Sequence, residues 1–290
     1  MLPKTFFLAA MKLASSAEVE DLIETALRED MPQGDITSES IIPASSVSRA
    51  VFLAKESGRL AGLDIARHVF EKIDPAVMFE KKAEDGVNFK KGDILAVIRG
   101  NSVALLKGER TALNFLQRLS GIATTTRQYV LAVKGTKTKV LDTRKTTPGL
   151  RSLEKYAVRM GGGQNHRLNL SEMVLIKDNH LCLAGSISQA VRTARAKVRP
   201  GIKIEVEVTD YTGATEALAA GADIIMLDNM TLMAMKRIVR FLDGRVPVEA
   251  SGGVTLERAA RIAALGVDFI SVGGLTHSYN SVDISLEFQE

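Results

Sequence analysis

The sequence has no tryptophan, one cysteine and few aromatic side chains, which make up 5% of the residues. The single cysteine, Cys182, excludes an intrachain disulfide and favours a reducing compartment, so we expect a cytoplasmic protein. Scarce aromatics leave few platforms for stacked bases, which disfavours nucleic acid as a partner. Apolar runs stay well below the ~18–20 residues that cross a bilayer, so we expect no membrane partner.

A secretion signal is disfavoured at the start of the chain. Residues 1–20 read MLPKTFFLAAMKLASSAEVE, and Lys12 interrupts the apolar run that follows Lys4, leaving an apolar core at the short limit for a signal peptide. We expect residues 1–17 to be a poorly ordered leader, with Met11 as an alternative start. A helix is predicted after it, from about residue 18 to 29.

The charge balance is mildly basic. Lysine and arginine number 38 against 34 aspartates and glutamates, a net charge of +4. Such an excess suits either nucleic acid or small anionic substrates. Because aromatics are scarce, a small polyanion fits better. The apolar fraction of 46% is typical of a globular chain with ample core.

From about residue 139 the chain alternates between short apolar segments and amphipathic helical ones, a pattern typical of a parallel β/α sheet. We expect an α/β fold with an N-terminal α/β domain over 18–120 and a catalytic domain over 121–280. The tail, 281–289, alternates like a strand and is expected to return to the first domain. Helices are predicted at 186–198, 211–220, 232–242 and 255–265, and strands at 139–145, 173–179, 202–208, 222–229, 246–253 and 268–274.

The N-terminal domain lacks this repeat. Residues 58–73 predict a helix after a turn, and 79–101 predict antiparallel strands joined by turns at "EDGV" and "KKGD". A long helical pattern follows over 105–133, with a predicted break near Gly121.

Polar residues follow the end of every predicted barrel strand. The first two ends are mainly cationic, the next two acidic, and the last two rich in glycine. Barrel enzymes build their sites from such carboxyl ends. The strand-end residues are Arg144 and Lys145, Lys177 and Asp178, Glu207, Asp228, Glu249 and Ser251, and Gly273 and Gly274.

Two glycine pairs predict an anion site. Ser251, Gly252 and Gly253 end one strand before Thr255, a predicted helix N-cap, and Gly273 and Gly274 end the next. Backbone N–H groups and the positive end of a helix dipole bind phosphate there. A pair of ordinary tight turns is the alternative for these glycines.

Glu207 and Asp228 occupy equivalent points of consecutive repeats, so both carboxylates are expected at one mouth. Paired carboxylates bind a metal, exchange protons or hold sugar hydroxyls, and an ion pair with nearby cations is the structural alternative. The cations Arg144, Lys145, Arg167 and Lys177, with His166 beside them, predict a pocket for a small polyanion. Arg151 either joins this pocket or is solvated, and His180 is interpreted as a capping residue.

The motifs together resemble one family. "ERTALNFLQRLSGIAT", "DTRKTTPGLR", "GGGQNHR", "LIKDNH", "EVEV", "IIMLDN", "SGGV" and "GGLTHS" occur in the order and spacing of quinolinate phosphoribosyltransferases, also called carboxylating nicotinate-nucleotide pyrophosphorylases. The resemblance runs from about Val19 to Phe288. It implies an N-terminal α/β sandwich followed by an open, TIM-like seven-stranded α/β barrel. Only six strands are evident from the pattern.

The resemblance also implies a reaction. Quinolinate and phosphoribosyl pyrophosphate would give nicotinate mononucleotide, pyrophosphate and CO2, with Mg²⁺ and no organic cofactor, on the de novo route to NAD. It further implies a homodimer, or a hexamer built from it, in which Arg110 reaches the pocket of the neighbouring subunit.

Residue roles follow from the same resemblance. Quinolinate would be held by Arg110, Arg144, His166, Arg167 and Lys177. Lys145, Glu207 and Asp228 would be catalytic and contact the ribosyl pyrophosphate, with the two acids placing magnesium directly or through substrate and water. The 5′-phosphate would lie on Ser251, Gly252, Gly253, Gly273, Gly274 and His277.

Two rival functions remain from the residues alone. One is a phosphoribosyltransferase-like enzyme of the same fold with another acidic substrate, which would not release CO2 from quinolinate. The other is a basic nucleic-acid binder on a barrel scaffold, which would bind generic duplex with a steep salt dependence.

Overall fold

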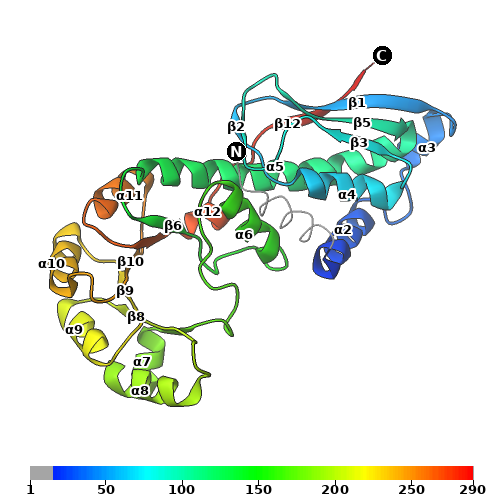
Figure 1. The fold of residues 1–290 in the computed structure, drawn as a ribbon. Coiled ribbons are helices and arrows are strands. Elements are labelled where there is room, and N and C mark those ends of the chain that lie inside the picture. The colour runs from blue at the N-terminus through cyan, green and yellow to red at the C-terminus, as the bar shows by residue number, and fades with distance from the viewer. Residues whose placement is uncertain (1–15, 290) are drawn as a thin grey trace. The chain divides into compact units, whose positions relative to one another are not determined.

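The structure, a computed structural model, describes residues 16–289. Most of the predicted leader, 1–17, therefore lies outside the described residues. The chain forms two compact units, coloured along the sequence in Figure 1. The first contains the described residues up to Arg127 together with Thr147–Gly162 and the chain from Tyr279 onward, and the second contains Gln128–Thr146 and Gly163–Ser278.

The first unit is built on an antiparallel sheet. Among the described residues it has four strands in the order β12-β1-β5-β3, and β12 pairs with β1 in the register Phe52↔Leu286. The bounds are β1 Val47–Ala54, β3 Met78–Lys81, β5 Ile94–Asn101 and β12 Ile284–Gln289, with a separate pair of β2 Gly58–Arg59 and β4 Asn88–Phe89. The helices are α2 Ala17–Asp30, α3 Ile36–Ile41, α4 Leu63–Ile73, α5 Ser102–Ala132 and α6 Arg151–Met160.

Apolar spacing explains the helices of this unit. In α2 the buried residues are Val19, Ile23 and Leu27, four apart, so one stripe of the helix faces the core. Across the core, the rings of Phe52 in β1 and Phe70 in α4 meet edge to face, with centroids 6.1 Å apart. The helix predicted over 18–29 is therefore confirmed.

Two predictions for this unit were wrong. Helix α5 continues through Gly121 without a break, because this glycine makes room for the returning tail instead of ending the helix. A Cβ at Gly121 would lie 2.2 Å from the backbone oxygen of Asn280. Within 79–101, the short strand β4 pairs with β2 and not with its sequence neighbours, whereas β3 and β5 do pair as antiparallel strands.

The second unit contains a parallel sheet covered by helices. Its strand order, β6-β11-β10-β9-β8-β7, places all six predicted segments in one sheet within residues 16–289. Helices α8 to α11 lie along the outer side of the curved sheet (Figure 1). The strands are β6 Lys139–Leu141, β7 Val174–Ile176, β8 Ile204–Val208, β9 Ile224–Asp228, β10 Val248–Ser251 and β11 Phe269–Ser271. The helices are α7 Asp178–Ala184, α8 Ile187–Lys197, α9 Tyr211–Ala219, α10 Leu232–Leu242, α11 Leu256–Ala263 and α12 Gly274–His277.

The seventh strand is reduced to a single residue in the described chain. Gln164 forms one parallel bridge with Leu141 of β6, on the side of β6 away from β11. The glycines before Gln164 and the loop after it leave too short an extended segment for a longer ladder. Among residues 16–289 the sheet is thus open between this bridge and β7, in agreement with the open barrel that the resemblance implies.

Side-chain caps begin three of the helices that follow strands of the parallel sheet. Thr255 accepts a hydrogen bond from the backbone N–H of Arg258, and Thr231 and Asp210 cap α10 and α9 in the same way. The predicted cap at Thr255 is confirmed. Among residues 16–289, no helix combines the length and apolar character that a membrane crossing requires.

Candidate active site

A cavity of about 800 Å³ opens at the carboxyl edge of the parallel sheet and lies wholly in the second unit. Because parallel strands end at the same edge, residues far apart in sequence meet there. Every predicted site residue except Arg110 lines it. These residues are Arg144, Lys145, His166, Arg167, Lys177, Glu207, Asp228, Ser251, Gly252, Gly253, Gly273, Gly274 and His277.

Two predicted residues are absent from this lining. Arg110 is exposed on α5 in the first unit, and Arg151 is half-buried at the start of α6 in that unit. Both residues belong to the unit that does not contain the cavity, so their part in the anion pocket stays a prediction.

Arg144 and Arg167 form the cationic side of the cavity. Burial and the positive charge of Arg144 lower the pKa of the Arg167 guanidinium. Arg167 donates from Nη1 to the backbone oxygen of Met173 at 2.8 Å, while its buried Nε has no hydrogen-bond partner within residues 16–289. An anion in the cavity would relieve the repulsion and accept from the remaining donors.

Lys177 and Glu207 form an ion pair at the mouth, with Nζ and Oε2 2.6 Å apart. The side chain of Glu207 is 12% exposed and that of Lys177 is 43% exposed. The lysine assigned to quinolinate therefore contacts the carboxylate assigned to ribose. His180 accepts from the backbone N–H of Lys177 through Nδ1 at 3.0 Å, so its interpretation as a capping residue is confirmed.

Asp228 ends β9 beside an unusual backbone position. Its Oδ2 accepts from the side-chain amide of Asn229 at 2.8 Å, and Asn229 has a φ of 52°. The oxygens of Glu207 and Asp228 are the hard donors that Mg²⁺ prefers, and two carboxylates suit an ion that also keeps water and substrate phosphate ligands. The residues present thus fit the magnesium that the resemblance implies.

The glycine loop after β10 approaches the backbone after β9 closely. Gly252 has a φ of 84°, and a Cβ there would lie 2.2 Å from Oδ1 of Asn229, so no other residue fits. Arg258, which the sequence reasoning missed, donates to the backbone oxygens of Gly253 and Met230 and fixes both loops. Its one signal in the sequence was its place in the first turn of α11.

Lys145, Gly273 and His277 lie together at the other end of the cavity. A Cβ at Gly273 would be 3.0 Å from Cδ of Lys145 and 3.1 Å from Nε2 of His277. Thr276 donates from its hydroxyl to the backbone oxygen of Lys145 at 2.8 Å. Two cationic or potentially cationic side chains thus border the bare backbone that begins α12, as phosphate binding requires.

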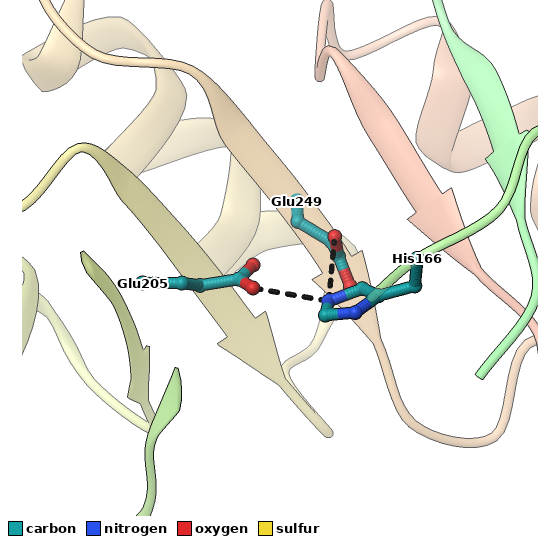
Figure 2. Close-up of side chains that lie close together, drawn as sticks. All are labelled: His166, Glu205 and Glu249. Atoms are coloured by element: carbon teal, nitrogen blue, oxygen red, sulfur yellow. Dashed lines mark hydrogen bonds and ion pairs between the residues drawn. The ribbon is translucent and has the colours of Figure 1, made fainter. Parts of the chain in front are cut away.

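Two buried glutamates lie against His166: Glu249, which lines the cavity and was predicted only as a strand-end residue, and Glu205, which was given no role from sequence. Nε2 of His166 lies 3.0 Å from Oε2 of Glu205 and 3.8 Å from Oε2 of Glu249 (Figure 2). The side chains of Glu205 and Glu249 are 0% and 2% exposed. Burial raises the pKa of both carboxyls, that of Glu249 to about 8, and the charge of Glu205 adds to the effect on Glu249. The alternation "IEVEV", which puts Glu205 and Glu207 on one face of β8, was the available signal.

Two family models match the chain. The quinolinate phosphoribosyl transferase N-terminal domain matches residues 35–120, and its C-terminal domain matches residues 122–287. Together they cover most of the chain.

Similar proteins carry related names. A probable nicotinate-nucleotide pyrophosphorylase [carboxylating] of Bacillus subtilis is 43% identical over 270 residues, 93% of each chain. A quinolinate phosphoribosyltransferase [decarboxylating] of Nicotiana tabacum is 39% identical over 292 residues, which span 93% of this chain and 82% of the tobacco protein. The solved nicotinate-nucleotide pyrophosphorylase of Francisella tularensis matches with a TM-score of 0.91 and 38% identity, over 96% of this chain and 99% of that one.

Proposed function

The chain belongs to the quinolinate phosphoribosyltransferase family, and we propose that it transfers the phosphoribosyl group of phosphoribosyl pyrophosphate to quinolinate. The products are nicotinate mononucleotide, pyrophosphate and CO2, in the synthesis of NAD. One observation carries the proposal: a single cavity combines arginines, the carboxylates of Glu207 and Asp228, and two glycine-rich strand ends. These three features match a dicarboxylate, a ribose and a phosphate.

Arg144, Arg167 and Lys177 would bind the quinolinate carboxylates, because a guanidinium donates two parallel hydrogen bonds to the two oxygens of a carboxylate. Lys145 lies beside Gly273 and would contact the ribosyl pyrophosphate. Ser251, the glycine loops and His277 would hold the 5′-phosphate. Glu207 would exchange its ion pair with Lys177 for the ribose hydroxyls as quinolinate takes over the lysine.

The chemistry depends on electrostatics. The ring nitrogen of quinolinate attacks C1 of the ribose as the bond to pyrophosphate breaks, and positive charge builds on the sugar. The carboxylates of Glu207 and Asp228 stabilise this charge. Mg²⁺, when bound with the substrate, would neutralise charge on the leaving pyrophosphate.

Decarboxylation follows on the new pyridinium. The bond between ring carbon 2 and its carboxylate breaks, CO2 leaves, and the electron pair remains on carbon 2 beside the positive nitrogen until a proton replaces it. This step needs the substrate to be oriented and water to be excluded. Arg144 and Arg167, bound to the other carboxylate, would orient the substrate. No organic cofactor is required.

We also propose a subunit assembly and a cellular location for the enzyme. Arg110, exposed on α5, would reach the quinolinate of a neighbouring subunit, so a homodimer, alone or within a hexamer, is the proposed active form. The single cysteine, Cys182, is exposed and suits the reducing cytoplasm, where we place the enzyme.

Incubation with quinolinate and phosphoribosyl pyrophosphate, with and without Mg²⁺, tests the activity. We expect nicotinate mononucleotide and CO2 in equal amounts, and much less product without the metal. Nicotinate mononucleotide formed from nicotinate and not from quinolinate would replace this function by that of a relative with another acidic substrate.

A further inference from the structure

The imidazole of His166 has both ring nitrogens engaged by this chain. Nδ1 accepts a hydrogen bond from the backbone N–H of Arg167 at 2.8 Å. A nitrogen that accepts carries no proton, so the ring proton lies on Nε2. Nε2 in turn points at Oε2 of Glu205, 3.0 Å away, and donates to it (Figure 2). The contacts therefore define one neutral tautomer, Nε2–H.

Buried carboxyls hold the backbone as well as the ring. The backbone N–H of His166 donates to Oδ1 of Asp142 at 2.9 Å, and Asp142 is fully buried at the end of β6. Glu205 comes from the middle of β8 and Glu249 from β10. Asp142, directly after β6, and Glu205 in β8 thus hold the turn that carries Arg167, whose side chain lines the cavity.

We propose that Glu205 is a positioning residue: it accepts the hydrogen bond from Nε2–H of His166 and, through the contact of Nδ1 with the Arg167 backbone, aims Arg167 at the substrate. His166 then acts mainly by supporting the backbone of Arg167. The family resemblance, by contrast, implied that His166 contacts quinolinate directly. The part of this inference that concerns the substrate rests on the proposed function. The part that concerns the tautomer of His166 and the geometry of the turn is independent of that function.

A metal ion is the rival explanation for the cluster. Donor atoms of His166, Glu205 and Glu249 all lie within 4.8 Å of one another, and one oxygen of each glutamate has no hydrogen-bond partner within residues 16–289. A metal-binding histidine, however, almost always donates from its second ring nitrogen to an acceptor. Here that nitrogen accepts from an N–H, and this favours a proton on Nε2 over a metal.

The first test measures the ligand-free protein. The chain has four histidines, so ¹⁵N-histidine labelling with His166→Gln for assignment identifies the His166 signals. We expect the Nε2–H pattern and slow amide exchange at Arg167. Glu205→Leu, which removes the acceptor, should shift the Nε2–H signal and speed exchange at Arg167, whereas Glu205→Gln, which keeps an oxygen, should leave both unchanged. An Nδ1–H or doubly protonated ring, or one divalent ion per chain surviving dialysis, would overturn the proposal.

The second test uses kinetics. In Glu205→Leu we expect KM for quinolinate to rise about 10-fold or more while KM for phosphoribosyl pyrophosphate changes less than about twofold; in Glu205→Gln the rise should stay below about threefold. The matched control is Val206→Ala in the same strand, which creates a buried cavity without touching His166. If the KM for quinolinate is unchanged in Glu205→Leu, Glu205 does not orient Arg167 toward quinolinate.

The two tests separate this inference from the proposed function. If the wild-type protein fails to convert quinolinate, the function is wrong, and the tautomer and Arg167 exchange still decide the positioning role. If turnover is normal but the tautomer differs, only the positioning role is wrong.

Discussion

At the scale of single residues, the proposed function predicts that the cationic side of the cavity sets the affinity for quinolinate. Arg144→Ala removes one two-point contact to a carboxylate. Because a charged hydrogen bond contributes ~1.5–3 kcal/mol, we expect quinolinate to bind roughly 10- to 150-fold more weakly. Isothermal titration measures the affinity directly. Arg240→Ala is the control, since Arg240 is exposed on α10 outside the cavity, and equal affinity losses in both variants would remove Arg144 from the site.

A second prediction for a single residue concerns Asp228, which we propose affects the catalytic rate more than the affinity for quinolinate. Asp228→Asn keeps the shape and removes the charge that stabilises the cation-like sugar, so kcat should fall more than quinolinate affinity does. We expect a fall of at least about 10-fold at saturating substrates, with a normal unfolding temperature. Steady-state kinetics with both substrates varied measures it. An unchanged kcat would refute the assignment.

At the scale of elements, the half-buried carboxyl of Asp85 connects α4 and α6. Asp85 accepts from the backbone N–H groups of Gly62 and Leu63, at 2.7 and 3.2 Å, and from the hydroxyl of Tyr156 at 2.6 Å. It therefore caps the start of α4 and ties α6 to it. Burial, followed by the charge of Asp85, raises the pKa of Tyr156, so the phenol remains a donor.

Removing that donor should destabilise the first unit. Tyr156→Phe leaves the Asp85 carboxyl, whose pKa burial raises, without one of its donors, and we expect the free energy of unfolding to fall by ~1–3 kcal/mol. The control is Tyr129→Phe, which loses a neutral bond to the backbone oxygen of Val254 and should cost only ~0.5–1.5 kcal/mol. Urea denaturation compares the two, and a smaller loss at Tyr156 than at Tyr129 would contradict the coupling of the helices.

At the scale of the whole molecule, the buried glutamates make stability depend on pH. Burial raises the pKa of Glu249 to about 8, above the ~4.3 of an unfolded glutamate. Between these values the folded chain binds more protons than the unfolded chain, so this contribution to stability is complete below about pH 4 and is lost as pH rises toward 8.

Glu249→Gln should flatten this dependence. In the wild type we expect the free energy of unfolding to fall by up to about 1.4 kcal/mol per pH unit between pH 5 and 8 from this group. Denaturation at several pH values measures the slope. An identical slope in Glu249→Gln would mean that the carboxyl is ionised in the folded protein throughout this range.

Assembly is tested at the same scale by mixing two defective subunits. We expect Arg110→Ala and Lys177→Ala each to be nearly inactive. If Arg110 acts across a two-fold dimer, half of a random mixture is heterodimer with one intact site of two, so about a quarter of wild-type activity returns.

A matched pair controls the mixing experiment. Arg144 and Lys177 line one cavity in one chain, so mixing Arg144→Ala with Lys177→Ala should restore nothing. Mass analysis must show heterodimers in both mixtures. If heterodimers form and the mixture of Arg110→Ala with Lys177→Ala still regains no activity, Arg110 does not act in the neighbouring subunit.

The sequence by itself determined the local elements and most of the cavity lining. Its repeat predicted the six strands and helices α8 to α11 because alternating apolar and amphipathic segments are set by near neighbours in the chain. The cavity followed because parallel strands end at one edge, so residues such as Lys177 and Asp228 had to meet there.

Only the tertiary structure decided which polar groups face one another. The spacing of Glu205 and Glu207 places both on one side of β8, but it does not say that the first lies against His166 and the second against Lys177. Nor did it show that Gly121 yields space to Asn280 inside a continuous helix. Pairing across strands depends on register, sheet curvature and the cost of burying charge, all of which arise from contacts between distant segments and leave no periodic pattern in the sequence.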